Sequence, residues 1–274
     1  MTALTTDPGF DINRTEEYKL SIQVNLDGFS FSVVHLHENR LLAARQFPIT
    51  VSSESFLGRR FTEWMNDTEL LQKKYSEVQF YYFSEKFTLV PSSFYEFKKQ
   101  NKIIEEAFGK LKGISVRDNY LPEDEANLVF TIPDSLMEAF EKKFPGNIIL
   151  HPVSLLSQKL HHDFLNNGDK SILALCFQNN FFSLLLYFQK KLQISNSFCY
   201  KHPNDVIFYI LSVLKVLKLN TSETGLLLAG NINQDDAIHS LLSEYFEKTE
   251  FISPSCQFNK TIFKAPLHPY IPLI

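Results

Sequence analysis

Two stretches of the chain, beginning near Lys19 and near Ser171, repeat one order of sequence patterns: three strand-like runs separated by tight turns, then a helical pattern and a further strand. In the first stretch, residues 19–25 alternate strictly between apolar and polar side chains, which is typical of a strand with one buried face. Turn-forming residues follow each strand, so successive strands are expected to pair as an antiparallel meander. We therefore expect an α/β protein made of two related halves.

The individual patterns can be placed along the chain. The first half predicts strands over 19–25, 29–36 and 41–47, a helix that starts at Ser53, and a strand over 78–83. The second half predicts strands over 171–177, 181–188 and 192–200, a helix that starts at Asn204, and a short strand over 226–228. The separation between Asn39 and Ser53 equals that between Lys190 and Asn204, which favours an internal duplication.

Between the two units we predict an insertion over about 85–126. It holds a helix over 94–110 that carries Lys98, Lys99 and Lys102. These lysines could form a phosphate-binding patch, but glutamates on the same helix favour an ordinary exposed face. The acidic loop at 123–125 is likewise expected to be solvated.

The rest of the chain predicts ordinary elements and a domain boundary. Strands are expected over 128–132 and 148–150, and helices over 134–144 and 152–166. A turn at Gly168 divides the chain into an N-terminal domain, 1–168, and a C-terminal domain, 169–274. Three prolines within 265–274 predict an extended tail packed on the surface.

The composition limits the classes of partner. A hydrophobic content of 44% supports a packed core, and a net charge of -4 gives no basic field for nucleic acid. Three isolated cysteines indicate neither a disulfide framework nor a thiolate metal site. Residues 1–10 lack a signal-peptide pattern, and three adjacent amides at 178–180 interrupt the most apolar stretch, which disfavours a transmembrane segment. We expect a cytoplasmic protein.

Two meander turns and a pair of small residues after a strand carry a resemblance to a known fold. These positions are Asp27 and Gly28, Asn179 and Asn180, and Ala229 and Gly230. The pattern resembles the actin-like (ribonuclease H-like) ATPase fold and is similar to the bacterial family of domain of unknown function 3822 (DUF3822). The resemblance extends over about 18–250. It implies two domains, each with a three-stranded antiparallel meander plus parallel strands and helices, with a cleft between them.

In active members of the actin-like superfamily, each first meander turn carries an Asp-x-Gly motif whose carboxylates organise hydrated Mg²⁺ while backbone amides hold phosphates. The first turn here keeps a carboxylate and a glycine at shifted positions, and the second turn, which begins at Gln178, has neither. The resemblance makes ATP and Mg²⁺ the candidate ligands, with no catalytic residue or metal ligand assigned. The candidate nucleotide-binding residues are Asn25, Asp27, Gly28, Asn179, Asn180, Ala229 and Gly230.

Two histidine groups could bind a metal ion. His35 and His37 face the same side of a strand, but no third ligand stands at a typical spacing, so a solvent-facing pair is favoured. The group at 161–163 lies near a helix end, where histidine is favoured by the helix dipole. The glycines form neither a Rossmann nor a P-loop motif, and no nucleophile elbow is present.

The first hypothesis is a catalytically degraded actin-like protein that serves as an interaction or scaffold module for an unidentified protein partner, with or without a ligand in its cleft. The alternative is an ATPase with non-standard phosphate-loop residues, in which Asp27 lies near the metal and Gly230 near the base. A third class, a kinase-like phosphotransferase, lacks an identifiable substrate base. Pairing with a second copy of the chain stays open.

Overall fold

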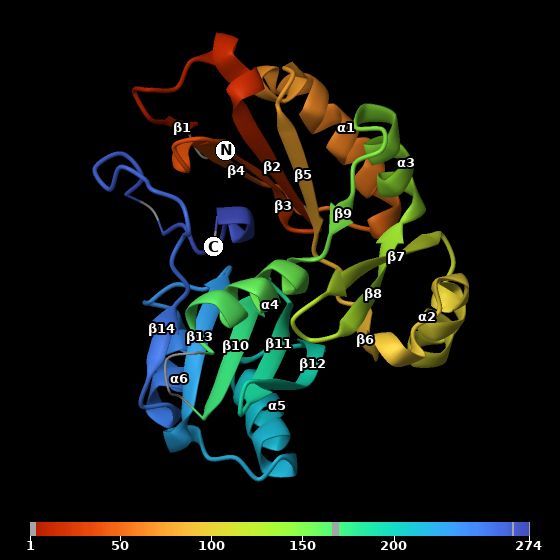
Figure 1. Ribbon diagram of the computed structural model, residues 1–274, viewed down its shortest axis with the longest axis vertical. Helices are drawn as coiled ribbons and strands as arrows, with labels where there is room; N and C mark the ends of the chain where they lie inside the picture. Colours follow the sequence, from red (N-terminus) through yellow and green to blue (C-terminus); the bar gives the residue numbers. More distant parts are fainter. Residues whose placement is uncertain (1–3, 166–169, 265, 274) are drawn as a thin grey trace.

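The computed structural model describes residues 4–165, 170–264 and 266–273. Figure 1 shows two sheet-containing halves, one above the other, with helix α4 (Pro152–Asp163) and the segment 266–273 lying between them. The expected domain boundary at Gly168 falls outside the described residues. Within the described residues, no helix is long and apolar enough to cross a bilayer.

The first half is built on a six-stranded sheet with the order β1-β4-β3-β2-β5-β9. Strands β2, β3 and β4 form the predicted antiparallel meander, and β5 adds to β2 in parallel. Their bounds are β1 Thr5–Thr6, β2 Tyr18–Asn25, β3 Gly28–His35, β4 Arg40–Pro48, β5 Glu77–Tyr82 and β9 Ile149–Leu150.

The second half repeats this arrangement in a five-stranded sheet with the order β12-β11-β10-β13-β14. Here β10, β11 and β12 form the antiparallel meander, and β13 adds to β10 in parallel. Their bounds are β10 Ser171–Phe177, β11 Phe181–Phe188, β12 Lys191–Cys199, β13 Thr224–Gly230 and β14 Thr249–Phe251.

Helices cover the outer faces of both sheets because the strands present large apolar side chains there. On the first sheet, α1 (Leu57–Asp67) and α3 (Asp134–Lys143) pack on this face; the Trp64 ring stacks on Phe29 at 4.9 Å between centroids. On the second sheet, α5 (Pro203–Val216) covers the face that carries Leu173 and Leu175, and α6 (Ala237–Tyr245) packs beside it. The outer face of the second sheet has a core of its own, whereas the core of the first half continues into the inner face of the second sheet, where Leu185 and Tyr187 belong to it.

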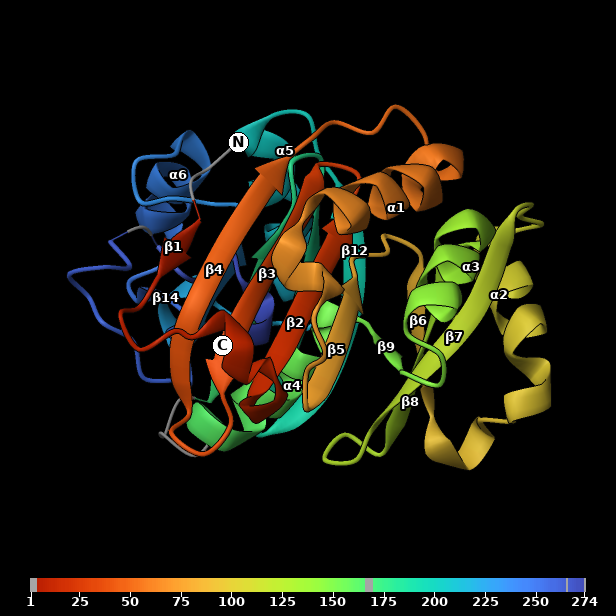
Figure 2. The same ribbon diagram turned by 90° about the horizontal axis from the view of Figure 1, so that it is seen from above.

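The insertion contains a separate sheet that the sequence patterns only partly predicted. Strands β6 (Phe87–Pro91), β8 (Ala126–Pro133) and β7 (Ile114–Leu121) pair in that order, and α2 (Gln100–Phe108) packs on them. Figure 2 shows this unit beside the first sheet. Because β6 and β7 have short or irregular alternation, their strand character depends on pairing with the buried β8. Short 3₁₀ turns connect the other elements.

The expectation of a surface tail at 265–274 is wrong for its described part. Ile271 is fully buried, and Leu267 and Leu273 are also buried. The segment 266–273, which ends in a 3₁₀ turn over Ile271–Leu273, lies against strand β2 and helix α4. Its prolines do prevent ladder pairing, but its apolar side chains draw it between the halves.

Candidate functional site at the meander turns

The first turns of the two meanders occupy equivalent places in their sheets. Asn25 pairs with Gly28 across the turn between β2 and β3, as Gln178 pairs with Phe181 between β10 and β11. The chain segments that follow the parallel strands β5 and β13 give the same alignment. The N–H of Phe83 donates to the carbonyl of Val24, and the N–H of Asn231 donates to the carbonyl of Phe177, in each case one residue before the turn. Asn25 and Gln178 are therefore equivalent residues.

These two equivalent residues contact each other. The side-chain amide nitrogen of Asn25 donates a short hydrogen bond to Oε1 of Gln178. Asn25 Oδ1 also accepts from the N–H of Asp27 at 2.9 Å, and Gln178 Nε2 donates to the carbonyl of Phe177 at 2.7 Å. Each amide is thus held by its own turn while it bonds to the other turn, so the orientation of both side chains is well defined.

A second contact joins the turns beside the first. The backbone N–H of Asn179 donates to Oδ2 of Asp27 at 3.2 Å. Behind it, the Tyr200 hydroxyl donates to the Gln178 carbonyl at 2.7 Å, and burial, with the Asp27 charge as a smaller cause, raises the pKa of Tyr200 to about 12. The Tyr200 hydroxyl is therefore a neutral donor at physiological pH.

A small pocket remains around the paired turns. Its volume is about 90 Å³, whereas small-molecule sites typically measure roughly 300–1,000 Å³. Among the described residues that line it, Asp27 alone is ionisable. The lining comes from both turns and from strands β2, β3 and β4, together with Phe83, Asn231 and Pro269.

Strand β13, which ends at Gly230, comes close to the second turn. Gly230 has φ +82°, and a Cβ built on it would lie 2.2 Å from the carbonyl oxygen of Phe177, so only glycine fits without a backbone shift. Both backbone groups of Gly230 are already bonded to His268: its N–H donates to the His268 carbonyl at 3.0 Å, and its carbonyl contacts His268 Nδ1 at 3.1 Å. Burial lowers the pKa of His268, which favours the neutral ring. Because a carbonyl oxygen only accepts, the Nδ1–H of this ring is the donor to Gly230.

The structure brings together most, but not all, of the predicted site residues. Asn25 and Asp27 bond to the second turn directly, and Gly28 lines the same pocket. Asn180 instead uses its carbonyl to accept from the N–H of Tyr200 on its own meander. Ala229 is buried in its strand. Sequence reasoning did not select Gln178, Gln23 or His268. Only Gln178 had a usable signal, its position as the last residue before a two-residue turn.

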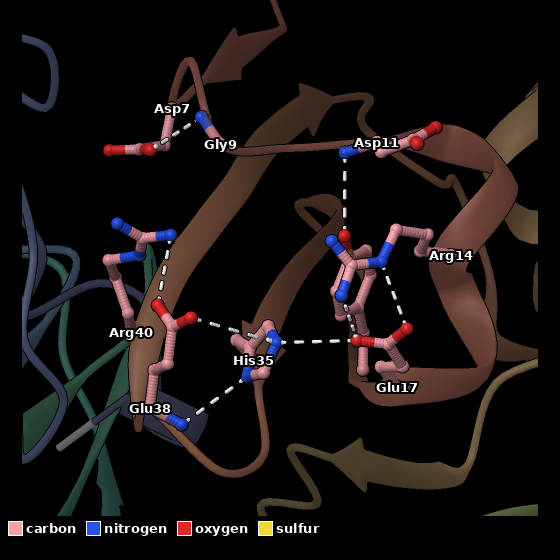
Figure 3. Close-up of polar contacts among 9 residues, drawn as sticks. Asp7, Gly9, Asp11, Arg14, Glu17, His35, Glu38 and Arg40 are labelled. Carbon is pink, nitrogen blue, oxygen red and sulfur yellow. Dashed lines mark hydrogen bonds and ion pairs between the residues drawn. The ribbon is translucent and has the colours of Figure 1, made fainter.

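The expectation of a solvent-facing histidine pair holds for His37, which is exposed, and fails for His35, which lies between two glutamates. Figure 3 shows His35 Nε2 between Glu17, at 3.6 Å, and Glu38, at 3.9 Å. The His35 side chain is only 12% exposed. Glu38 also pairs with Arg40 at 2.9 Å. Within residues 4–165, 170–264 and 266–273, no three His, Cys, Asp or Glu side chains are grouped so as to hold a metal ion.

The acidic loop is also placed differently from the expectation. The Asp124 side chain is 2% exposed. Its carboxylate accepts hydrogen bonds from Ser157 at 2.6 Å and Tyr187 at 2.8 Å, and it pairs with His161 at 2.9 Å. The tip of the β7–β8 hairpin therefore reaches both α4 and β11, which links the inserted sheet to the second half. His161 lies in the last turn of α4, as expected, and in addition makes this contact.

The helix expected over 94–110 begins only at Gln100, so Lys98 and Lys99 lie in a 3₁₀ turn before it, but the lysine-bearing segment has the ordinary exposed face that was favoured. Lys99 pairs with Glu96 at 2.6 Å, and Lys102 pairs with Glu106 at 3.6 Å, with all four side chains more than half exposed. Such exposed pairs contribute little to stability.

Comparisons with known proteins agree with this architecture. A family model described as protein of unknown function (DUF3822) matches residues 7–249. A search of curated proteins gives no significant match. A Bacteroides thetaiotaomicron crystal structure, described as having an actin-like ATPase fold and unknown function, matches with a TM-score of 0.80 and 18% identity, over 96% of this chain and 98% of that one.

Two further solved structures share the fold at lower similarity. The PilM-PilN type IV pilus biogenesis complex matches with a TM-score of 0.57 and 11% identity, covering 93% of this chain and 94% of that one. The ethanolamine utilization protein EutJ from Carboxydothermus hydrogenoformans matches with a TM-score of 0.50 and 8% identity, covering 98% and 90%. The expectation of an actin-like α/β fold is confirmed by these likenesses.

Proposed function

This chain belongs to the DUF3822 family of proteins of unknown function, and from that premise we propose that it is a catalytically degraded actin-like protein that serves as an interaction or scaffold module. The observation that carries the proposal is the hydrogen bond between Asn25 and Gln178. At the two positions where the fold's phosphate motifs begin, uncharged amides bond to each other.

The charges around the turns support the same proposal. A hydrated Mg²⁺ with bound phosphates needs carboxylates directed at the metal and amide donors directed at the phosphates. Here the one carboxylate, Asp27, accepts the N–H of Asn179, so a donor and an acceptor of the two turns already satisfy each other. The residues at the turns therefore do not fit a Mg-phosphate site of the usual form.

The base side of the cleft is occupied as well. His268 uses both a backbone and a side-chain contact on Gly230, and its ring stacks on Phe251 at 4.5 Å between centroids. A ligand that approached Gly230 would first have to displace His268. In the PilM-PilN complex, this fold takes part in a type IV pilus biogenesis assembly, so the fold is compatible with a role in protein association.

The proposal includes two further points. We propose a cytoplasmic location, which three free thiols support. We also propose an origin of the two halves by internal duplication, which their shared strand order supports.

A Mg-ATP titration followed by thermal unfolding tests the proposal. We expect no dose-dependent rise in melting temperature, because a ligand that binds only the native state would stabilise it. Asp27→Ala is the informative variant, with the exposed Asp235→Ala as its matched control. A rise in melting temperature that is lost in Asp27→Ala but kept in Asp235→Ala would overturn the proposal and favour the nucleotide-binding ATPase.

A further inference from the structure

The inner face of the first sheet is unusually polar. Ser21 and Gln23 of β2 pair with Ser32 and Ser30 of β3, and all four side chains are buried. The equivalent positions in the second sheet are less polar. The register that aligns Asn25 with Gln178 places Ala174, Cys176 and Leu185 at the places of Ser21, Gln23 and Ser32, and a serine is kept only at Ser183, the place of Ser30. A face that was permanently closed would be expected to resemble the second sheet.

The polar side chains of this face are only partly satisfied. The hydroxyls of Ser21 and Ser32 are buried and have no hydrogen-bond partner within the described part of the chain. Buried polar atoms in native proteins are nearly always bonded, since an unsatisfied one costs stability. Two hydroxyl groups on this face are therefore free to bond to another molecule if the face is uncovered.

That cover is the segment 266–273, which is held as a bound peptide would be. Gln23 donates from Nε2 to the carbonyl of Pro269 at 3.1 Å and accepts the N–H of Ile271 at Oε1 at 2.6 Å. One side-chain amide thus bonds both an acceptor and a donor of the segment's backbone, at the place where its turn at 268–269 leads into the 3₁₀ turn over Ile271–Leu273. Ile271 and Leu273 supply buried apolar anchors on either side of a proline.

The groove continues past the end of this segment. A cavity of about 350 Å³ lies on the same face of the sheet, next to Leu273. Its lining includes polar side chains from both sheet and helix, among them Lys19, Gln79, Tyr81 and Gln158. The groove can therefore accommodate an occupant larger than the segment that fills it.

We propose that the groove between the first sheet and α4 is a peptide-binding site, which segment 266–273 occupies in cis and from which a partner's proline-containing apolar peptide displaces it. Ser21, Gln23 and Ser32 form its polar floor. The inference rests on the interaction role proposed above and identifies its site. Because the segment is covalently attached, its high effective concentration excludes weak competitors.

Native-state hydrogen exchange on the full chain tests whether the segment opens. The N–H of Ile271 is bonded to Gln23 and the N–H of Gly230 to His268, so both lose protection when the segment leaves. We expect both amides to exchange at least about 100-fold faster than the paired amides of β2 and β10. Exchange of all these amides at one common rate, through global unfolding alone, would overturn the proposal.

Peptide binding tests the site itself. A fluorescent peptide with the sequence of residues 266–273 is titrated against the full chain and followed by anisotropy, with a scrambled peptide as control. Ile271→Ala weakens the attached segment, so we expect it to bind the peptide at least about tenfold more tightly than the unmodified chain. Adding Gln23→Leu, which removes the backbone clamp, should abolish that gain.

Two controls separate this effect from general loosening. Ile104→Ala removes an equally buried isoleucine from the inserted sheet, away from the groove, and should not increase binding. Ile271→Val is the milder variant if Ile271→Ala fails to fold. Absence of saturable binding to both Ile271 variants would show the segment to be a permanent part of the core. No nucleotide is used, so this result and the Mg-ATP titration can fail independently.

Discussion

The side-chain amides of Asn25 and Gln178 hydrogen bond to each other although 153 residues separate them in the sequence. They occupy equivalent turn positions in two sheets, so the contact joins the two halves at a single pair of corresponding residues. In the actin-like fold this is where phosphate motifs face each other. Here the pair bridges the two turns, so the bond is one of the contacts that hold the halves together.

A double-mutant cycle of Asn25→Ala and Gln178→Ala should show a coupling free energy of about 1 kcal/mol in urea unfolding, the usual net value of a neutral hydrogen bond. The matched control is the exposed neutral pair Asn259 and Thr261, whose side chains hydrogen bond at 2.6 Å. Their cycle should give a coupling close to zero. Equal couplings in the two cycles would contradict the role assigned to the turn contact.

Gly230→Ala should destabilise the protein by roughly 3 kcal/mol or more. The substitution combines a left-handed backbone with a Cβ 2.2 Å from the Phe177 carbonyl oxygen, which cannot move independently of its strand. Gly146→Ala has a similar φ, +78°, with open space around the Cβ, and should cost only about 1 kcal/mol. Chemical denaturation of both variants separates the close approach from the backbone strain.

Asp124→Ala should lower the free energy of unfolding by roughly 2–4 kcal/mol, because it removes the acceptor of the buried Ser157 hydroxyl and leaves Tyr187 only the Ser157 oxygen, at 3.1 Å. The neighbouring Glu123 is exposed, and Glu123→Ala should change stability by no more than about 0.5 kcal/mol. Urea unfolding followed by circular dichroism gives both values. Similar values for the two variants would mean that the hairpin tip is not anchored.

Ser21→Ala should stabilise the protein by about 1 kcal/mol, since it removes a buried hydroxyl that lacks a partner and leaves the alanine found at the equivalent place in the second sheet. Ser157→Ala is the matched control. That hydroxyl is equally buried but donates to Asp124 at 2.6 Å, so its loss should be destabilising. Thermal unfolding should therefore show a higher melting temperature for Ser21→Ala, and a lower one for Ser157→Ala, than for the unmodified protein.

The free energy of unfolding should fall as the pH drops from about 6.5 to about 4, because His151 is protonated more readily in the unfolded chain than in the folded one. Burial lowers the pKa of His151 to about 4, and its neutral ring uses both nitrogens: Nε2 contacts the Ser84 carbonyl at 2.9 Å, and Nδ1 accepts the N–H of Val153 at 3.2 Å. The unfolded chain takes up the proton first as the pH falls, so the loss is complete near the folded pKa.

The size of this loss should be roughly 3 kcal/mol, from a depression of about two pKa units or somewhat more. Urea unfolding at pH 7 and pH 4.5 measures it. His151→Asn keeps a side-chain acceptor for the first turn of α4 and has no ring to titrate, so its stability should depend less on pH across this interval. A pH dependence unchanged by His151→Asn would assign the effect to other groups.

Local patterns were sufficient to predict the elements whose burial is regular. The strands predicted over 171–177 and 181–188 have the bounds of β10 and β11, because continuous apolar runs between turn residues leave few alternatives. Strands β6 and β7 of the insertion were not predicted as strands. Their side chains are only partly buried, so pairing with β8, rather than their own periodicity, sets their conformation.

The sequence by itself determined the two meanders, their turns and the actin-like order of elements, because hydrophobic period and turn chemistry act over a few residues. Only the tertiary structure decided that Gln178 meets Asn25, that Asp124 is buried, and that segment 266–273 lies between the halves. These contacts depend on how two separately specified sheets are placed against each other, and no local pattern encodes that placement.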